Sequence, residues 1–244
     1  MSRWIIKSTT VMGLLLVIFS SVYVGAEEAR PEASADMSVL NKYIWRGFEL
    51  SDDGIVIQPS VAVSYKGLSL NLWGNLDTNY YLNDDAEFSE TDMTLSYATG
   101  LGPVALDIGY IYYALDGSDT GEIYVSAGID TLLSPSLSIY RDMDEFPGWY
   151  VNFGVSHSID FGNGIALDLA ASVGYMDADD TDYQEMHDGF ISVGLTIPVA
   201  KYVTLSPMIA YSFGLSSEAD ALFEAGPSTE SSFLLGGITL SMAF

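Results

Sequence analysis

The stretch VIQPSVAVSYKGLSLNLWGNLD, residues 56–77, decides the fold of this chain. Two runs of equal length flank Lys66-Gly67, and within each run apolar residues alternate strictly with small or polar ones. Successive side chains of a strand point to opposite faces, so this period of two predicts two strands joined by a tight turn. Each run is long enough to cross a bilayer as a tilted strand.

The same alternation recurs along the chain and predicts an all-β protein of about twelve strands. The predicted strands cover residues 37–46, 56–65, 68–77, 90–99, 104–113, 121–130, 135–144, 149–159, 164–175, 187–197, 202–213 and 232–244. No stretch after the N-terminal 26 residues combines helix caps with a 3.6-residue period, so no helix is predicted there.

The connections between these strands alternate between tight turns and longer loops. Outer-membrane barrels sort their loops in this way, whereas a soluble sandwich with Greek-key connections has no reason to do so. In lipid every backbone amide must be paired, so an all-β chain can span a membrane only as a closed barrel. We therefore predict a transmembrane up-and-down antiparallel β-barrel with both termini at the short-turn end.

The two ends of the chain indicate export to the outer membrane. A basic start, an apolar run over residues 11–24 and small residues before Glu27 are typical of a secretory signal peptide cleaved after Ala26. The predicted organisation is a signal peptide at 1–26, a flexible periplasmic leader at 27–36 and a barrel at 37–244. The alternating last strand with its terminal Phe244 resembles the end of Gram-negative outer-membrane proteins, so we predict a bacterial outer-membrane location.

Acidic residues dominate the charge, with 33 Asp and Glu against eight Lys and Arg. This balance argues against nucleic acid as a partner and fits cations or neutral solutes. The chain has no cysteine, so it has neither a disulfide framework nor a thiolate metal site, and no cofactor is predicted. The acids gather in two predicted loops, as Asp84, Asp85, Glu87, Glu90 and Asp92, and as Asp177, Asp179, Asp180, Asp182 and Glu185. These loops form either a solvated surface or sites for divalent cations such as Ca²⁺.

Inward-facing positions are mostly small, which in a twelve-stranded barrel predicts a narrow water-filled channel. The residues predicted to line the pore are Lys42, Arg46, Asn71, Trp73, Asp77, Asp107, Tyr113, Tyr124, Asp142 and Asp168. Asp107 and Asp168 lie at similar depth, and a ring of acids favours cations. The other acids of inward parity are Asp77, Glu122, Asp130, Asp142 and Asp144. Two alternatives stay open: Lys42 and Arg46 neutralise the inward acids as a structural network, and the inward aromatic rings either guide solutes or only pack the barrel.

Residues 41–47, NKYIWRG, followed by Gln58-Pro59 and the Lys66-Gly67 turn, resemble the opening of the TorF-type porin family. In that family a first strand ending in aromatic-x-aromatic-Arg-Gly precedes a second strand that carries Pro and Gln. Gln58 directly precedes Pro59 here, which departs from the family's spacing. The resemblance implies a porin without a defined substrate and singles out Arg46.

We therefore expect an outer-membrane porin-like channel for passive diffusion of small solutes, with a preference for cations or neutral molecules, and no enzyme. The alternative is a non-conducting structural or surface-binding barrel, and a hydrolase at the rim around His187 is less favoured. His157 lacks the His-x-Ser spacing of outer-membrane lipases because Ile159 occupies the serine position. Expected partners are outer-membrane lipid and lipopolysaccharide, small solutes and divalent cations at the acidic loops.

Overall fold

The structure is a computed structural model that describes residues 30–51, 54–80 and 85–244. The barrel strands are β1 (Glu32–Leu40), β4 (Val56–Tyr65), β5 (Leu68–Asp77), β6 (Glu87–Leu101), β7 (Val104–Leu115), β8 (Thr120–Ile129), β9 (Ser136–Asp142), β10 (Gly148–Gly162), β11 (Ile165–Ala178), β12 (Gln184–Ala200), β13 (Val203–Gly214) and β14 (Ser232–Ala243). The remaining elements are the short strands β2 (Ile44–Trp45) and β3 (Phe48–Glu49) and the helix α1 (Ser217–Phe223).

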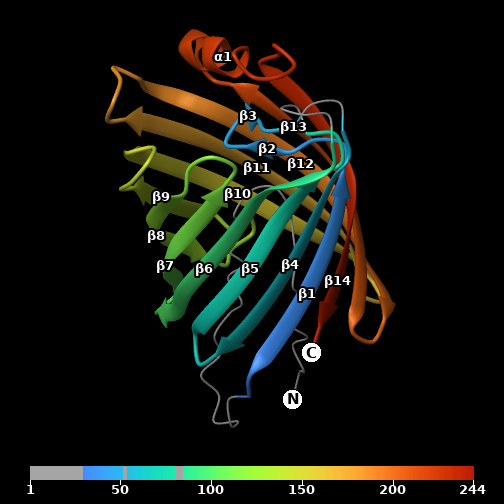
Figure 1. The fold of residues 1–244 in the computed structure, drawn as a ribbon. Helices are drawn as coiled ribbons and strands as arrows, with labels where there is room; N and C mark the ends of the chain where they lie inside the picture. Colours follow the sequence, from blue (N-terminus) through green and yellow to red (C-terminus); the bar gives the residue numbers. More distant parts are fainter. Residues whose placement is uncertain (1–29, 52–53, 81–84) are drawn as a thin grey trace.

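The barrel is closed, and each wall strand pairs antiparallel with its neighbours in chain order. Closure comes from β1, which pairs with β4 on one side and with β14 on the other. The strands run obliquely around the barrel, and β1 starts and β14 ends opposite α1 (Figure 1). This confirms the predicted up-and-down twelve-stranded barrel, which has no free sheet edge.

Apolar side chains cover the outside of the wall and polar ones lie inside. Val61 and Leu72 are 51% and 46% exposed, whereas Asn75 and Asp77 on the opposite parity are fully buried. A water-soluble protein would bury the apolar set, so this outer face is suited to hydrocarbon. Exposed aromatic residues surround the short-turn end: Tyr65, Tyr97, Phe161, Tyr202 and Phe244. Such a belt is typical of the membrane–water interface.

The tight turns follow from their residues. Lys66 and Gly67 have φ of 52° and 86°, and Asn163 and Gly164 have φ of 55° and 79°. Positive φ at both central positions defines the type I′ turn, whose twist matches that of the flanking strands. These two dipeptides therefore set the register of the hairpins β4–β5 and β10–β11.

The structure differs from the prediction at the first strand and in the loop before the last one. The first strand covers Glu32–Leu40 instead of 37–46, so the predicted leader at 27–36 overlaps the barrel wall, and residues 41–46 lie outside the wall. The loop before β14 contains α1, a short helix capped by Ser216, whose side chain accepts a hydrogen bond from the backbone of Ala219. Seven residues are too few to show a helical period, which explains the omission. Among the described residues, no helix is long and apolar enough to cross a membrane. The predicted signal peptide at 1–26 lies outside the described residues.

Candidate functional site

Residues 41–51, named here the lumen hairpin, leave the wall after β1 and enter the barrel at its long-loop end (Figure 1). Within it β2 and β3 pair only with each other and form a sheet separate from the wall. Arg46 and Gly47, with φ of 48° and 83°, make its two-residue turn. The turn has the same I′ character as Lys66-Gly67, so Arg46 stands at the tip of a hairpin.

Arg46 reaches across the lumen to β8, five strands away from β1 in the sheet order. Its Nη1 and Nη2 each donate to one carboxylate oxygen of Glu122, both at 2.7 Å. The rings of Trp45, Tyr140 and Tyr150 lie 4.4, 4.6 and 4.3 Å from the guanidinium carbon. The charge is thus buried in an aromatic enclosure and balanced by a bidentate carboxylate, which is a strong and geometrically specific contact.

Hydrogen bonds extend this cluster around the wall. The hydroxyl of Tyr113 donates to Glu122 Oε2 at 2.9 Å, and that of Tyr150 donates to Asp188 Oδ1 at 2.9 Å. The side-chain amide of Asn152 donates to the Tyr150 oxygen at 3.2 Å. The inward aromatic residues of this region therefore pack around Arg46 and do not line an open path for solutes.

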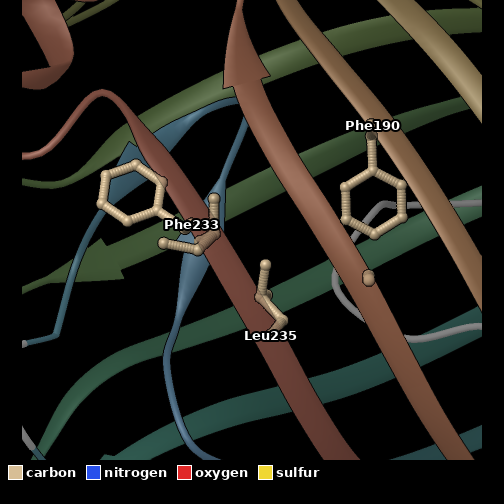
Figure 2. Packing of buried hydrophobic residues seen from close by; sticks show 5 residues of the cluster. Phe190, Phe233 and Leu235 are labelled. Atoms are coloured by element: carbon tan, nitrogen blue, oxygen red, sulfur yellow. The ribbon is translucent and has the colours of Figure 1, made fainter.

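The opposite side of the lumen hairpin packs on β12, β13 and β14. Ile44 belongs to a buried cluster with Phe190, Ala210, Phe233 and Leu235, which Figure 2 shows lining the inner wall. Apolar side chains are unusual inside an otherwise polar lumen. They provide a hydrophobic seat for the hairpin, whose burial favours the inserted position.

Helix α1 covers the tip of the lumen hairpin. The ring of Phe223 packs edge-on against Phe48 and His187, with centroids 5.4 and 4.9 Å apart. Gly47 permits this approach, because a Cβ at that position would lie 2.2 Å from Phe223 Cζ. The helix and the hairpin are therefore packed as one unit at the mouth.

Polar contacts fix the base of the hairpin. Lys42 forms an ion pair with Glu49, whose other oxygen accepts a hydrogen bond from the backbone nitrogen of Ser228 at 3.1 Å. On the β5 side the ring of Tyr43 lies 5.6 Å from that of Trp73. The hairpin thus contacts several sides of the lumen at once.

Together these contacts fill the long-loop half of the barrel. At this level the inward side chains of seven wall strands are buried: Asp92, Tyr113, Glu122, Tyr140, Tyr150, Asp188, Phe190 and Phe233. In an open pore of this size the same positions would face lumen water. The lumen hairpin takes the place of that water.

The short-turn half is lined by small side chains, many of them half-buried: Ser60, Ala62, Ser96, Ser138, Ser156, Ala170, Ser172 and Ser206. Other inward residues of this half are buried: Asp107, Ser126, Ala166, Asp168 and Ser192. A recess in this half lies between β9 and β12. Asp107 accepts a hydrogen bond from Tyr124 and Asp168 accepts one from Thr196, both at 2.7 Å. The second oxygen of each carboxylate has no hydrogen-bond partner in the described part of the chain.

The predicted pore-lining residues divide between the two halves. Asp77, Tyr113 and Asp142 lie in the long-loop half, Asn71, Asp107 and Asp168 in the short-turn half, and Trp73 and Tyr124 between them. Lys42 and Arg46 belong to the lumen hairpin instead of a wall strand, which corrects their predicted placement. Arg46 pairs with Glu122 and Lys42 with Glu49, so the neutralising network predicted as an alternative exists at the inward acid Glu122 and not at Asp107 or Asp168.

The predicted pore-lining set omitted the main partners of Arg46. Parity had placed Glu122 inward, but the set did not include it. The Arg46-Gly47 dipeptide, which has the form of the Lys66-Gly67 turn, was a usable signal for the hairpin. The seat of Ile44 and the contact of Phe223 join residues far apart in the sequence. No local pattern indicates such contacts.

His187 is placed unfavourably for a rim hydrolase. The ring is fully buried, packs 5.1 Å from Phe48 and 4.9 Å from Phe223, and interacts through Nδ1 with the hydroxyl of Tyr183 at 2.5 Å. A catalytic histidine has to reach a substrate. In this arrangement His187 acts as a packing residue beneath α1.

The acidic loops show one strong contact at the outer surface. Arg141 binds both carboxylate oxygens of Asp179 and lies 5.1 Å from the ring of Trp149. Hydrogen bonding to Arg141 lowers the pKa of Asp179 below its ordinary value. Over the described residues, no three His, Cys, Asp or Glu side chains are arranged to hold a metal ion.

Comparisons with known proteins agree with this fold. No family model and no curated protein matches the sequence. Among solved structures, the KdgM porin matches with a TM-score of 0.55 and 13% identity, over 84% of this chain and 97% of that one. The NanC porin matches with a TM-score of 0.56 and 9% identity, over 86% of this chain and 98% of that one. At such low identity the likeness shows the fold alone: this chain has the barrel architecture of small porins.

Proposed function

We propose that this chain forms a channel of the bacterial outer membrane through which small cations or neutral solutes diffuse. The observation that carries the proposal is the character of the lumen below the hairpin. There the inward side chains are mostly small and polar, and the carboxylates of Asp107 and Asp168, which are 4% and 8% exposed, have no cationic partner among the described residues. Carboxylates without a counter-ion in a narrow pore attract cations and repel anions. The porin-like fold supports a channel and leaves the solute open.

The other parts of the proposal rest on the sequence. The signal peptide, the terminal Phe244 and the lipid-suited outer face support an outer-membrane location, with lipid and lipopolysaccharide as neighbours. The acidic loops would face outward and bind divalent cations at most weakly. The proposed relation to TorF-type porins also rests on the sequence, at residues 41–47, Gln58-Pro59 and Lys66-Gly67.

Ion selectivity in a planar lipid bilayer tests the proposal. We expect Asp107→Asn combined with Asp168→Asn to lower the cation-to-anion permeability ratio, obtained from reversal potentials in a salt gradient, because it removes two lumen charges. Asp179→Asn is the matched control, since it removes one carboxylate from an outer loop. An unchanged ratio in the double variant would show that these acids do not select ions.

A second candidate is a barrel that does not conduct, and the filled long-loop half favours it. The same bilayer measurement separates the two candidates. Channel steps from the folded protein support a channel, and their absence in every variant supports a structural or surface-binding barrel.

A further inference from the structure

The lumen hairpin occupies the solute path. At its level the inward side chains of Tyr113, Tyr140 and Tyr150 are 2%, 4% and 4% exposed. The atoms that cover them include those of the hairpin residues Trp45 and Arg46. A solute entering from the long-loop end therefore meets packed side chains before it reaches the small-residue half.

In the part of the chain that the structure describes, backbone-to-backbone hydrogen bonds to the wall flank the hairpin at its two ends. Asn41 N donates to Gly236 O at 3.1 Å, and Thr78 N donates to the carbonyl of Ile55 at 3.0 Å. Between these points β2 and β3 bond to each other and not to the barrel sheet. Within the described residues, the hairpin can leave the lumen without breaking any strand pairing of the wall.

Side chains hold the inserted position, and the ion pair is the strongest of their contacts. The contacts of Ile44 with its hydrophobic cluster and of Phe48 with Phe223 are apolar. The free energy lost when the hairpin leaves the lumen therefore grows gradually with the apolar area that becomes exposed. The Arg46–Glu122 pair is different, because withdrawal of Arg46 leaves the Glu122 carboxylate between Tyr113 and the lumen without its counter-ion. Breaking a buried ion pair is strongly unfavourable until water replaces the missing partner.

We propose that the lumen hairpin is a gate, closed in this structure, and that the Arg46–Glu122 ion pair is its latch. This inference rests on the proposed channel function. In the open state the hairpin moves toward the long-loop mouth together with α1, water enters the upper lumen, and the acidic wall from Asp92 to Asp188 becomes part of the conducting path.

The test uses the full-length mature protein in a planar bilayer, with potassium chloride as the permeant salt. Wild-type protein is expected to stay closed for most of the record and to open rarely. Arg46→Gln keeps a side chain of similar polarity but removes the charge, and open probability should rise on the order of a hundredfold because the closed state loses its counter-ion. The single-channel conductance of the open level should stay near that of rare wild-type openings.

Arg141→Gln is the matched control. Arg141 also makes a bidentate pair with an acid beside a tryptophan, but on the outer surface. The same substitution there should leave open probability unchanged. Heat-dependent gel mobility of each variant verifies that the barrel has folded.

A cross-link provides a second measurement that does not depend on the latch. The chain has no cysteine, so Ile44→Cys with Ala210→Cys introduces the only two thiols, in residues that pack in one cluster. In the Arg46→Gln background, bridging them with a short bifunctional thiol reagent should suppress the openings. Each single-cysteine variant, treated alike, should still open.

The outcomes separate the two proposals. A folded wild-type protein that conducts as often as Arg46→Gln, or a bridged protein that conducts like the unbridged one, overturns the gate and leaves the channel standing. Absence of conduction in folded wild-type, Arg46→Gln and unbridged variants overturns the channel function, and the gate with it.

Discussion

The two halves of the lumen are built on the same strands but filled differently. On β8, three inward residues follow one another from the long-loop end: Glu122 binds Arg46, Tyr124 binds Asp107, and Ser126 binds the hydroxyl of Ser138. Over this short distance the contacts change from a buried ion pair to a hydroxyl pair. The larger inward side chains of the long-loop half pack against the lumen hairpin, and the small ones below it pair with each other.

This contrast shows how a barrel can separate stability from permeability. Closure of the sheet satisfies the backbone along the whole height, so neither half needs packed contents to exist in lipid. The short-turn half carries mostly small polar side chains, among them the buried Ser126 and Ser192. The long-loop half instead holds a compact polar and aromatic core that belongs to the mouth.

The largest expected loss of stability comes from breaking the buried Arg46–Glu122 ion pair. The Ser126–Ser138 hydrogen bond, which involves the same face of β8, provides the comparison. Glu122→Ala leaves the guanidinium of Arg46 buried without a carboxylate and should cost about 3–5 kcal/mol of unfolding free energy. Ser126→Ala removes one hydrogen bond to Ser138 of 2.7 Å and should cost about 0.5–1.5 kcal/mol. Urea unfolding in detergent, followed by tryptophan fluorescence, measures both.

A double substitution sharpens that comparison. Arg46→Met with Glu122→Leu removes both charges and keeps the volume, so the loss should be smaller than for Glu122→Ala alone, because no unpaired charge remains. Equal losses for Glu122→Ala and Ser126→Ala would contradict the different character of the two halves.

A smaller effect is expected where the hairpin meets α1. Gly47→Ala adds a methyl group at positive φ that would lie 2.2 Å from Phe223 Cζ, so it combines backbone strain with a clash. Gly102, in a turn at the other end, has φ of 63°, and a Cβ added there would meet no atom within 4 Å, so Gly102→Ala isolates the strain. We expect about 1 kcal/mol for Gly102→Ala and about 1–3 kcal/mol more for Gly47→Ala.

Protease sensitivity of the loop that contains α1 checks the same comparison. Gly47→Ala should expose residues 215–231 to cleavage because Phe223 loses its position, while Gly102→Ala should not. Equal stability and equal cleavage in the two variants would mean that α1 does not depend on the hairpin.

The wall of this barrel was predictable from the sequence, and its contents were not. Alternation with period two is imposed by the pleat, and the hydrocarbon outside reinforces it, so the predicted strands 56–65 and 68–77 have the same bounds as β4 and β5. The predicted first strand at 37–46 was wrong because NKYIWRG has apolar and aromatic residues that suit a wall strand. In the structure these residues belong to the lumen hairpin. Its Arg-Gly dipeptide marks a turn that the strand interpretation passed over.

The contacts inside the lumen could not be predicted for a related reason. Parity predicts that Asp107, Tyr113 and Asp168 point inward, and all three are buried in the structure. Parity cannot tell a side chain that faces water from one that faces an inserted hairpin. The Arg46–Glu122 contact joins residues 76 positions apart, and Phe223 meets Gly47 from still farther along the chain. Only the folded arrangement brings such partners together.

The smallest effect on stability is expected outside the barrel. There Arg141 and Asp179 form the same type of arginine–carboxylate pair as Arg46 and Glu122, but exposed to solvent. Water and salt screen exposed charges, so Asp179→Asn should leave the unfolding midpoint at neutral pH almost unchanged, in contrast to Glu122→Ala. The pKa of Asp179 is lowered in the folded state by Arg141, so its contribution is present above the ordinary value of 3.8 and is lost as the pH falls through the lowered pKa. The small difference between wild-type and Asp179→Asn protein should therefore disappear at acidic pH and in high salt. If instead Asp179→Asn destabilises the barrel as much as Glu122→Ala does, burial in the lumen is not what makes the Arg46–Glu122 pair strong.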